Sequence, residues 1–192
     1  MAFADIFLDD CYGLGRWGRP VRTILDVGAN VGLFSLAARL RYPDALIHAY
    51  EPDVRLGEYL IAQANVGRFE VDFSAIGRDA GFARLDRSAD SVLNRAVTDA
   101  SGDIPQVAFS EAVARLGGRV DLVKMDCEGA EWEILADAPA WRNVRAVAME
   151  YHLTGGRKHA DPAHVMASLG FEVLEHFPSE GCGIVLARRG AP

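Results

Sequence analysis

Apolar runs alternate with amphipathic stretches along most of the chain, and this alternation predicts strands and helices in turn. Residues 22–27 form an apolar segment, and Leu33, Leu36, Ala37 and Leu40 follow at the three- and four-residue spacing of a helix face. Further strands are expected at 45–50, 68–76, 120–125 and 144–149, and further helices at 54–64, 110–116, 129–135 and 162–169. This order is typical of a parallel sheet with helices on both faces.

Two helix starts and the end of the chain refine the pattern. Ser110 and Asp161 are expected as helix N-caps, with Pro162 at the first position of the last helix. The apolar segments 171–174 and 183–186 have no helix between them, so they predict an antiparallel hairpin at one sheet edge. Segments 82–86 and 92–98 are read as short strands or irregular chain, and no chemistry is assigned between 77 and 109. The expected fold class is a doubly wound α/β domain with a mostly parallel sheet.

Composition limits the number of domains and the class of partner. A chain of 192 residues, half of them apolar, suits a single domain over 1–192, with 1–20 as a short lead-in. The 20 basic and 27 acidic residues give a net charge of −7, which argues against nucleic acid as the main partner.

Compartment is also indicated by the sequence. No apolar run approaches the ~18 residues that span a bilayer, and the N-terminus lacks a secretion-signal pattern. Cys11, Cys127 and Cys182 are odd in number and lack metal-ligand or redox-pair spacing, which fits a reducing compartment. We therefore expect a cytoplasmic protein without a membrane partner, and the sequence leaves its oligomeric state open.

The turn after the first expected strand reads Asp26-Val27-Gly28-Ala29-Asn30-Val31-Gly32. Glycine and asparagine tolerate left-handed backbone, and glycine lets a ligand approach the chain without meeting a Cβ. The dinucleotide fingerprint needs glycine at the two positions that Asn30 and Leu33 occupy, so a pyrophosphate loop is disfavoured. A plain strand–helix turn with two glycines is the alternative.

Four of the expected strands end with an acidic residue: Asp26, Glu51, Asp126 and Glu150. Ligands of an open parallel sheet bind beyond the carboxyl ends of its strands, so these side chains should meet on one rim. Asp26 would repel a phosphate there, whereas Glu51 is placed to accept hydrogen bonds from both hydroxyls of a ribose. The ligand that fits is a nucleoside with a cationic group and no phosphate. S-adenosylmethionine meets that description.

His152 lies two residues after Glu150, so an extended chain would direct both side chains to one side. A histidine oriented by a carboxylate can act as a general base, although a lone histidine is more often structural. Asp126, Glu128, Glu150 and His152 could also bind a divalent cation, but their spacing is not diagnostic and no metal ligand is assigned. For Glu131 the favoured interpretation is that it complements the N-terminus of the following helix.

Three segments and a shorter fourth carry a pattern found in a known enzyme family. They are residues 24–32, Ala49-Tyr50-Glu51-Pro52, Val123-Lys124-Met125-Asp126-Cys127-Glu128-Gly129-Ala130-Glu131 and Glu150-Tyr151-His152. Together they resemble the FkbM family of S-adenosylmethionine-dependent methyltransferases. The resemblance extends from about residue 5 to 186, and its most specific part is the Lys-x-Asp-x-Glu-Gly-x-Glu run.

The resemblance implies a role for each matching position. The methionine end of the cofactor would be lined by Asp26, Gly28, Asn30 and Gly32, and Glu51 would hold the ribose. The adenine would lie near Pro52, Asp53, Ser74, Ala75 and Ile76. Asp126 would sit beside the transferring methyl group, with Glu128, Glu150 and His152 facing the acceptor. Family members typically methylate hydroxyl groups of sugars and secondary metabolites, so the implied reaction is O-methylation of a small molecule.

Two other functions stay open at this point. A nicotinamide-dependent oxidoreductase shares the fold class, but Asn30, Leu33 and the lack of a Tyr-x-x-x-Lys pair disfavour it. A cofactor-binding module that needs a partner chain to complete its acceptor pocket is the second, because little chain precedes the first strand. The identity of the acceptor and the choice between His152 and Asp126 as general base are not determined by the sequence.

Overall fold

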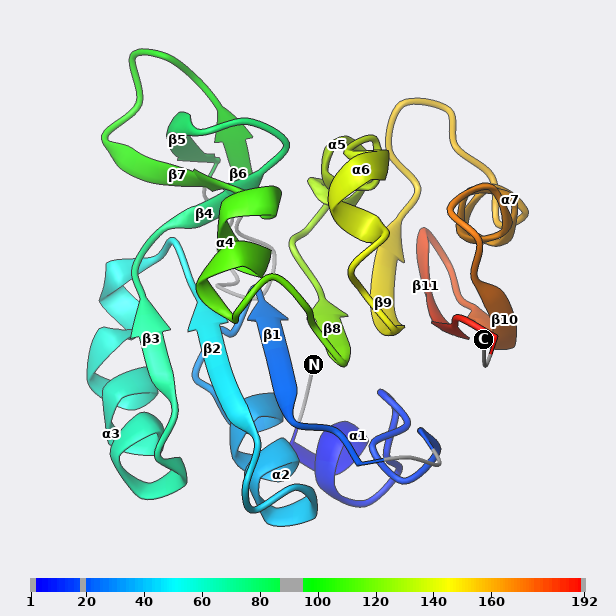
Figure 1. Cartoon of the computed structure of the whole chain (residues 1–192). Helices are drawn as coiled ribbons and strands as arrows, with labels where there is room; N and C mark the ends of the chain where they lie inside the picture. The colour runs from blue at the N-terminus through cyan, green and yellow to red at the C-terminus, as the bar shows by residue number, and fades with distance from the viewer. Residues whose placement is uncertain (1–2, 18–19, 87–94, 191–192) are drawn as a thin grey trace.

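The computed structural model describes residues 3–17, 20–86 and 95–190, and a central sheet organises them. Its strands are β1 (Thr23–Val27), β2 (Leu46–Tyr50), β3 (Glu70–Asp72), β8 (Leu122–Met125), β9 (Ala146–His152), β10 (Glu172–Pro178) and β11 (Cys182–Arg188). They lie in the order β10-β11-β9-β8-β1-β2-β3 (Figure 1). The strands from β9 to β3 are parallel, and β11 runs antiparallel to both β9 and β10. The predicted mostly parallel α/β sheet and its antiparallel edge hairpin are confirmed.

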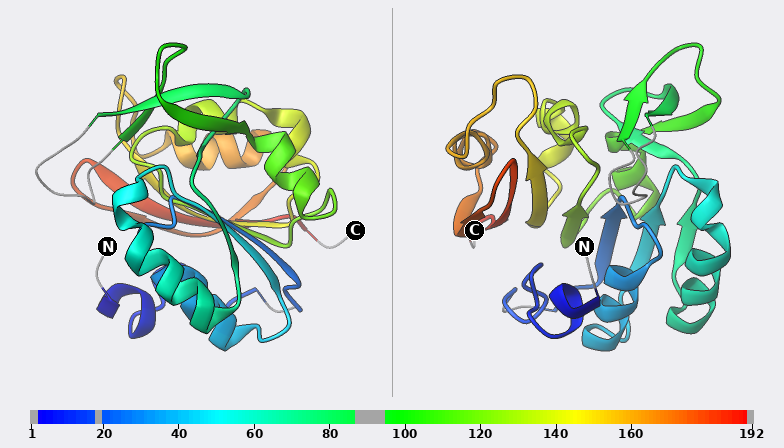
Figure 2. Two further views of the ribbon diagram at one scale, coloured as in Figure 1. Left: turned by 90° about the vertical axis from the view of Figure 1, so that its left-hand side faces the viewer. Right: turned by 180° about the vertical axis from the view of Figure 1, so that it is seen from behind.

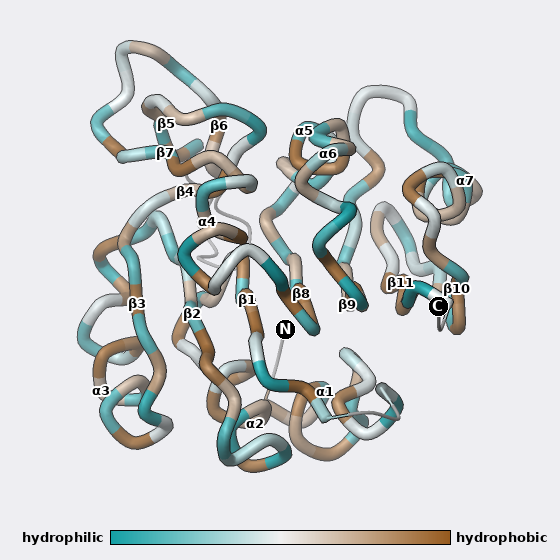
Figure 3. Tube along the Cα trace, in the orientation of Figure 1, coloured by the Kyte–Doolittle hydropathy of each residue, from teal (hydrophilic) through white to brown (hydrophobic). Residues whose placement is uncertain are grey.

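Helices cover both faces of this sheet, as the edge-on view in Figure 2 shows. One face carries α1 (Phe3–Phe7), α2 (Leu33–Arg41) and α3 (Gly57–Gly67), with a short 3-10 helix, η1 (Val54–Leu56), before α3. The other carries α4 (Phe109–Arg115), α5 (Glu131–Leu135), α6 (Ala138–Trp141) and α7 (Asp161–Ser168). Because side chains alternate along a strand, Ile24 packs toward α2 and Leu25 toward α4, and two apolar cores result. Figure 3 shows hydrophobic residues along the central strands.

A second, smaller sheet stands at the end of the molecule where β1 and β2 finish (Figure 1). It has the order β4-β7-β5-β6, built from β4 (Ala75–Gly77), β5 (Gly81–Asp86), β6 (Arg95–Thr98) and β7 (Ile104–Ala108). The prediction of one strand over 68–76 is therefore wrong, since β3 joins the central sheet and β4 the smaller one. A strand at 82–86 is present, whereas residues 92–94 of the second expected segment lie outside the described residues.

Local details of the helices differ from the sequence-based expectations. Ala108 and not Ser110 is the N-cap of α4, because the fully buried Phe109 is its first helical residue. Ala160 caps α7, and the Asp161 carboxylate accepts a hydrogen bond from the Lys158 amide (2.9 Å) instead. Neither α1 nor α6 was expected. In the part of the chain that the structure describes, none of the helices combines the length and apolarity needed to cross a membrane.

Candidate active site

A pocket with about 910 Å³ of empty space, its open mouth included, lies at the carboxyl ends of β1, β2 and β8. This is the rim at which the sequence places a ligand. Nine of the expected site residues line it: Gly28, Asn30, Glu51, Pro52, Ser74, Ala75, Ile76, Asp126 and Glu128. Three side chains that were not expected there, Ile6, Tyr12 and Lys124, also line the pocket.

The Glu51 carboxylate is held by backbone groups on both sides of it. Its Oε2 accepts a hydrogen bond from the Asn30 amide (2.7 Å), and its Oε1 accepts one from the Asp53 amide (2.8 Å). The left-handed backbone of Asn30, with φ of 52°, turns its amide toward the carboxylate. Burial raises the pKa of Glu51 to about 6, although the two amides partly oppose that rise. Glu51 is thus a fixed, mostly buried acceptor at the pocket wall.

Gly28 directly follows β1 in the pocket wall and lies against the backbone of Asp126, which directly follows β8. It has φ of 75°, and a Cβ at this position would lie 1.8 Å from the backbone oxygen of Asp126. Glycine is therefore required here for both backbone conformation and space. The other predicted glycine, Gly32, starts α2 with φ of 86° and is not in the pocket wall. Asp53 is not in the wall either, because its side chain caps η1 and pairs with Arg55.

Asp26 does not face the pocket, which corrects the expected contact between this side chain and a ligand. Its carboxylate is fully buried, 3.3 Å from Lys124 Nζ, and Ser35 Oγ donates a hydrogen bond to it (2.7 Å). Strand alternation directs Asp26 toward α2, so α2 and not the pocket covers it. A ligand would meet Lys124, and Asp26 would act through that cation.

Lys124 joins several parts of the site. Besides pairing with Asp26, its ammonium donates a hydrogen bond to the Gly28 carbonyl oxygen (2.6 Å) and lies 5.5 Å from the centre of the Tyr12 ring. Burial alone would lower the pKa of Lys124, but the carboxylates of Asp26 and Asp126 outweigh it and raise the pKa. A lysine inside the apolar segment 120–125 was the available sequence signal for a buried ion pair.

The two carboxylate oxygens of Asp126 differ in their hydrogen bonding. Tyr12 donates its hydroxyl hydrogen to Oδ2 (3.0 Å), and burial together with the Asp126 charge raises the pKa of Tyr12 well above its usual value. Oδ1 is buried and has no hydrogen-bond partner among the described residues. No periodicity in the sequence indicated Tyr12, because its lead-in segment reaches the site through tertiary packing.

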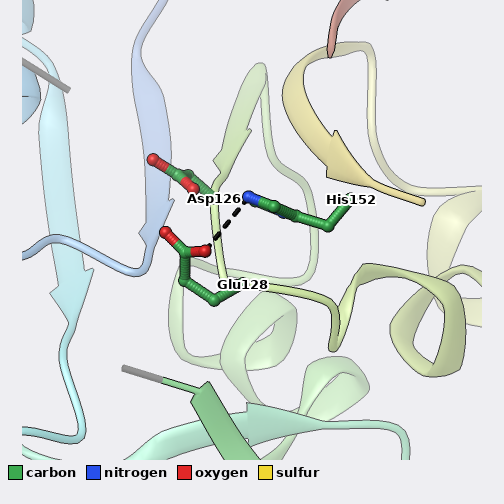
Figure 4. Close-up of side chains that lie close together, drawn as sticks. All are labelled: Asp126, Glu128 and His152. Atoms are coloured by element: carbon green, nitrogen blue, oxygen red, sulfur yellow. Dashed lines mark ion pairs between the residues drawn. The ribbon is translucent and has the colours of Figure 1, made fainter. Parts of the chain in front are cut away.

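Asp126, Glu128 and His152 converge on one point beside the pocket (Figure 4). His152 Nε2 lies 3.1 Å from Glu128 Oε2, and Nδ1 lies 3.3 Å from Glu131 Oε1. Burial would lower the pKa of His152, but the hydrogen bonds to Glu128 and Glu131 outweigh it and raise the pKa to about 11. Both ring nitrogens of His152 face carboxylates, an arrangement that favours the imidazolium form and disfavours a role as general base.

Two more acidic residues lie near this point: Glu131, the first residue of α5, and Glu150 on β9. Glu131 is fully buried, and its Oε1 also accepts hydrogen bonds from the amides of Cys127 (3.1 Å) and Gly129 (3.0 Å), so it braces the β8–α5 loop as well as His152. Glu150 lies on β9 on the same side as His152, and it is half-buried. Burial, followed by the charge of Asp126, raises the pKa of Glu150 to about 7. Acidic side chains are therefore concentrated beside the pocket.

Comparison with known proteins decides the family. The model of the methyltransferase FkbM domain matches residues 26–181, which include β1, the pocket wall and β9. The chain belongs to the FkbM methyltransferase family. As a member of this family it is a methyltransferase, and family and fold imply a methyl donor of the S-adenosylmethionine type.

Curated relatives agree with this FkbM assignment, and a solved structure shares the fold. The chain is 28% identical to the 31-O-demethyl-FK506 methyltransferase FkbM of Streptomyces tacrolimicus, over 80% of this chain and 75% of that protein. It is 29% identical to methyltransferase sdnD of Sordaria araneosa, over 77% and 73% of the two chains. The fold matches a precorrin-6y C5,15-methyltransferase from Geobacter metallireducens GS-15 with a TM-score of 0.56, 14% identity, and coverage of 95% and 87%. Membership of the FkbM family leaves no support for the oxidoreductase alternative.

Proposed function

We propose that this chain transfers the methyl group of S-adenosylmethionine to a hydroxyl oxygen of a small-molecule acceptor. The observation that carries the proposal is that one pocket contains both a fixed acceptor for a ribose, Glu51, and a carboxylate, Asp126, whose Oδ1 has no hydrogen-bond partner among the described residues. The names of the FkbM relative and its 31-O-demethyl substrate support oxygen as the accepting atom.

The residues present fit the proposed donor. The buried Glu51 carboxylate suits the two hydroxyls of a ribose. Pro52, Ser74, Ala75 and Ile76 form an uncharged stretch of wall that suits an adenine ring. We assign the methionine end to the turn at Gly28 and Asn30. When bound, S-adenosylmethionine supplies a methyl group on a cationic sulfur.

The acceptor would enter on the side of Asp126, Glu128, Glu150 and His152. We assign the proton of the acceptor hydroxyl to Asp126 Oδ1, since that oxygen has no hydrogen-bond partner among the described residues. Tyr12 would keep the carboxylate oriented through Oδ2. His152 would serve as a positioned cation that holds Glu128. Most of the rate enhancement is expected from holding the reactants in line in a site that excludes water.

Calorimetric titration of the purified chain with S-adenosylhomocysteine and with NAD tests the donor. We expect the chain to bind S-adenosylhomocysteine and not NAD. Glu51→Ala should lower the affinity for S-adenosylhomocysteine about tenfold or more, because a hydrogen bond to a charged group is lost. Glu70→Ala, which removes an exposed carboxylate from β3, is the matched control and should leave affinity unchanged. Equal affinity of the Glu51 variant and the native chain would show that the ribose assignment is wrong.

The acceptor atom is tested with a methyl-labelled donor and a panel of hydroxylated small molecules. Label recovered as a methyl ether supports the proposal. Label on nitrogen or carbon would contradict it. Donor binding without transfer to any acceptor would favour a module that needs a partner chain.

A further inference from the structure

We propose that Asp126, Glu128 and His152 form a binding site for a divalent metal ion at the edge of the pocket. Each residue offers one ligand atom, and these three atoms lie within 4.8 Å of one another. They come from two elements: the β8–α5 loop carries the carboxylates, and β9 carries the histidine. Figure 4 shows all three side chains directed toward a common space.

The spacing of the donor atoms fits a metal ion. Adjacent ligands of an octahedral ion, each at about 2.1 Å, lie about 3 Å apart, and opposite ligands about 4.2 Å. His152 Nε2 and Glu128 Oε2 are 3.1 Å apart, which is the spacing of adjacent ligands. Small side-chain rotations would therefore be enough to place an ion among the three.

The histidine is oriented as a metal ligand usually is. A ligating histidine commonly donates its second ring N–H to a carboxylate, which fixes the ring and its tautomer. Here Glu131 Oε1 lies 3.3 Å from Nδ1, and the same oxygen is anchored by the Cys127 and Gly129 amides. Glu131 is fully buried, so it is a positioning residue of the site and not a ligand. This leaves Nε2 directed toward the two carboxylates, and a bound ion would replace the proton that Nε2 shares with Glu128, which would be released to solvent.

A buried oxygen without a partner gives a second, independent reason for a ligand. Asp126 Oδ1 is buried and accepts no hydrogen bond from the described residues, a condition that costs free energy unless something else satisfies the atom. Glu150 adds a further carboxyl group on the side of β9 that carries His152. Lys124 is already paired with Asp26, so it offsets the charge of the carboxylates only in part. A divalent cation would satisfy the oxygen and offset the charge together.

The ligand set indicates the class of ion and its use. Two carboxylates and one imidazole suit Mn²⁺, Mg²⁺ or a similar divalent ion, and three protein ligands leave coordination positions open for water or other oxygens. If the proposed function holds, those positions would bind the acceptor hydroxyl, and with the ion bound the ion would take over from Asp126 Oδ1 the activation of that hydroxyl. The ion-binding site itself does not depend on that function.

Direct binding of Mn²⁺ to the full chain, stripped of metal with a chelator, tests the site by electron paramagnetic resonance and calorimetry. One tight Mn²⁺ site is expected. His152→Ala and Glu128→Gln should each weaken it at least tenfold. His164→Ala on the exposed side of α7 and Glu180→Gln in the exposed 179–181 turn are the matched controls, and both should bind Mn²⁺ as the native chain does.

Circular dichroism establishes that each variant is folded before its affinity is compared. Absence of Mn²⁺ binding to the native chain, or equal binding by Glu128→Gln and Glu180→Gln, would overturn the proposal. Titration with S-adenosylhomocysteine in the presence of chelator separates this result from the proposed function. Donor binding without Mn²⁺ binding would refute the metal site alone, whereas Mn²⁺ binding without donor binding would refute the proposed donor alone.

Discussion

Near the carboxyl ends of the strands, rows of apolar side chains continue into charged ones. On β1 the row that faces α2 runs from Ile24 to Asp26, and on β8 it runs from Leu122 through Lys124 to Asp126. The same alternation on β9 leads from Ala148 to Glu150 and His152. Charge therefore collects where each strand leaves the core, and Lys124 offsets part of it.

Because the pKa of Glu51 is raised, we expect the affinity for S-adenosylhomocysteine to depend on pH. Above a pKa of about 6 the side chain is a carboxylate, which accepts hydrogen bonds from ribose hydroxyls, and below it the protonated form accepts them less well. The affinity for S-adenosylhomocysteine should thus be highest above pH 6 and fall as the pH drops through 6, by up to about tenfold per pH unit. Calorimetry between pH 5 and pH 8 measures this dependence.

Glu51→Gln, which cannot titrate, supplies the control for that experiment. Its affinity should be lower than native at pH 8 and nearly constant across the range. A native chain whose affinity stays constant down to pH 5 would show that Glu51 does not bind the donor through its ionised form. An equally steep pH dependence in the variant would assign the titration to another group, such as Glu150.

The turn between β1 and α2 requires glycine at position 28, so we expect Gly28→Ala to lower the free energy of unfolding. Gly28→Ala forces an L-residue into left-handed backbone, at a cost of about 1–2 kcal/mol, and drives a Cβ against the Asp126 carbonyl. Because the atom that the Cβ would meet belongs to the backbone, β1 and β8 must separate, which adds a further ~1–3 kcal/mol to the loss of unfolding free energy. Urea denaturation measures the total.

Gly117→Ala isolates the backbone part of that loss. Gly117 follows α4 with φ of 84°, and a Cβ there would meet no atom within 4 Å among the described residues. This variant should lose only the ~1–2 kcal/mol of left-handed strain. If Gly28→Ala and Gly117→Ala lost the same free energy of unfolding, the contact between a Cβ at position 28 and the Asp126 carbonyl would not contribute to the loss.

Elements with a strong local period were predictable, and those set by tertiary contacts were not. The apolar segments that became β1, β2 and β8, and the 3.6-residue period of α2, appear within one or two residues of their expected bounds. The 68–76 segment reads as one strand, yet β3 and β4 pair with different partners, and pairing is not encoded locally. The same limit applies to the helix start at Phe109, where burial and not a capping side chain decides the position.

In the candidate site too, some residues could be placed from the local sequence and others only from tertiary contacts. Glu51 and Asp126 could be placed from strand ends alone, because carboxyl ends of parallel strands share one rim. Asp26 could not, since one residue of register decides whether a side chain faces a ligand or α2. Tyr12 comes from a segment 114 residues away from Asp126 in the sequence, and only folding brings the two together.

The molecule as a whole contains two cores that share the same strands. Trp17 lies in the core beneath α1 and α2, and Trp141 lies in the core beneath α4 and α7. β1, β8 and β9 contribute alternate residues to both cores, so unfolding of one core would expose the back of strands that support the other. We therefore predict that the chain is one domain that unfolds in a single cooperative transition.

Two variants that each retain one tryptophan test this prediction. The first carries Trp132→Phe and Trp141→Phe and reports on Trp17, and the second carries Trp17→Phe and Trp132→Phe and reports on Trp141. Because the substitutions themselves change stability, fluorescence is compared with far-ultraviolet circular dichroism within each variant during urea unfolding. The two signals should give coincident midpoints in both variants. Fluorescence that changes before circular dichroism in either one would mean that its core unfolds separately, and the single-domain assignment would be wrong.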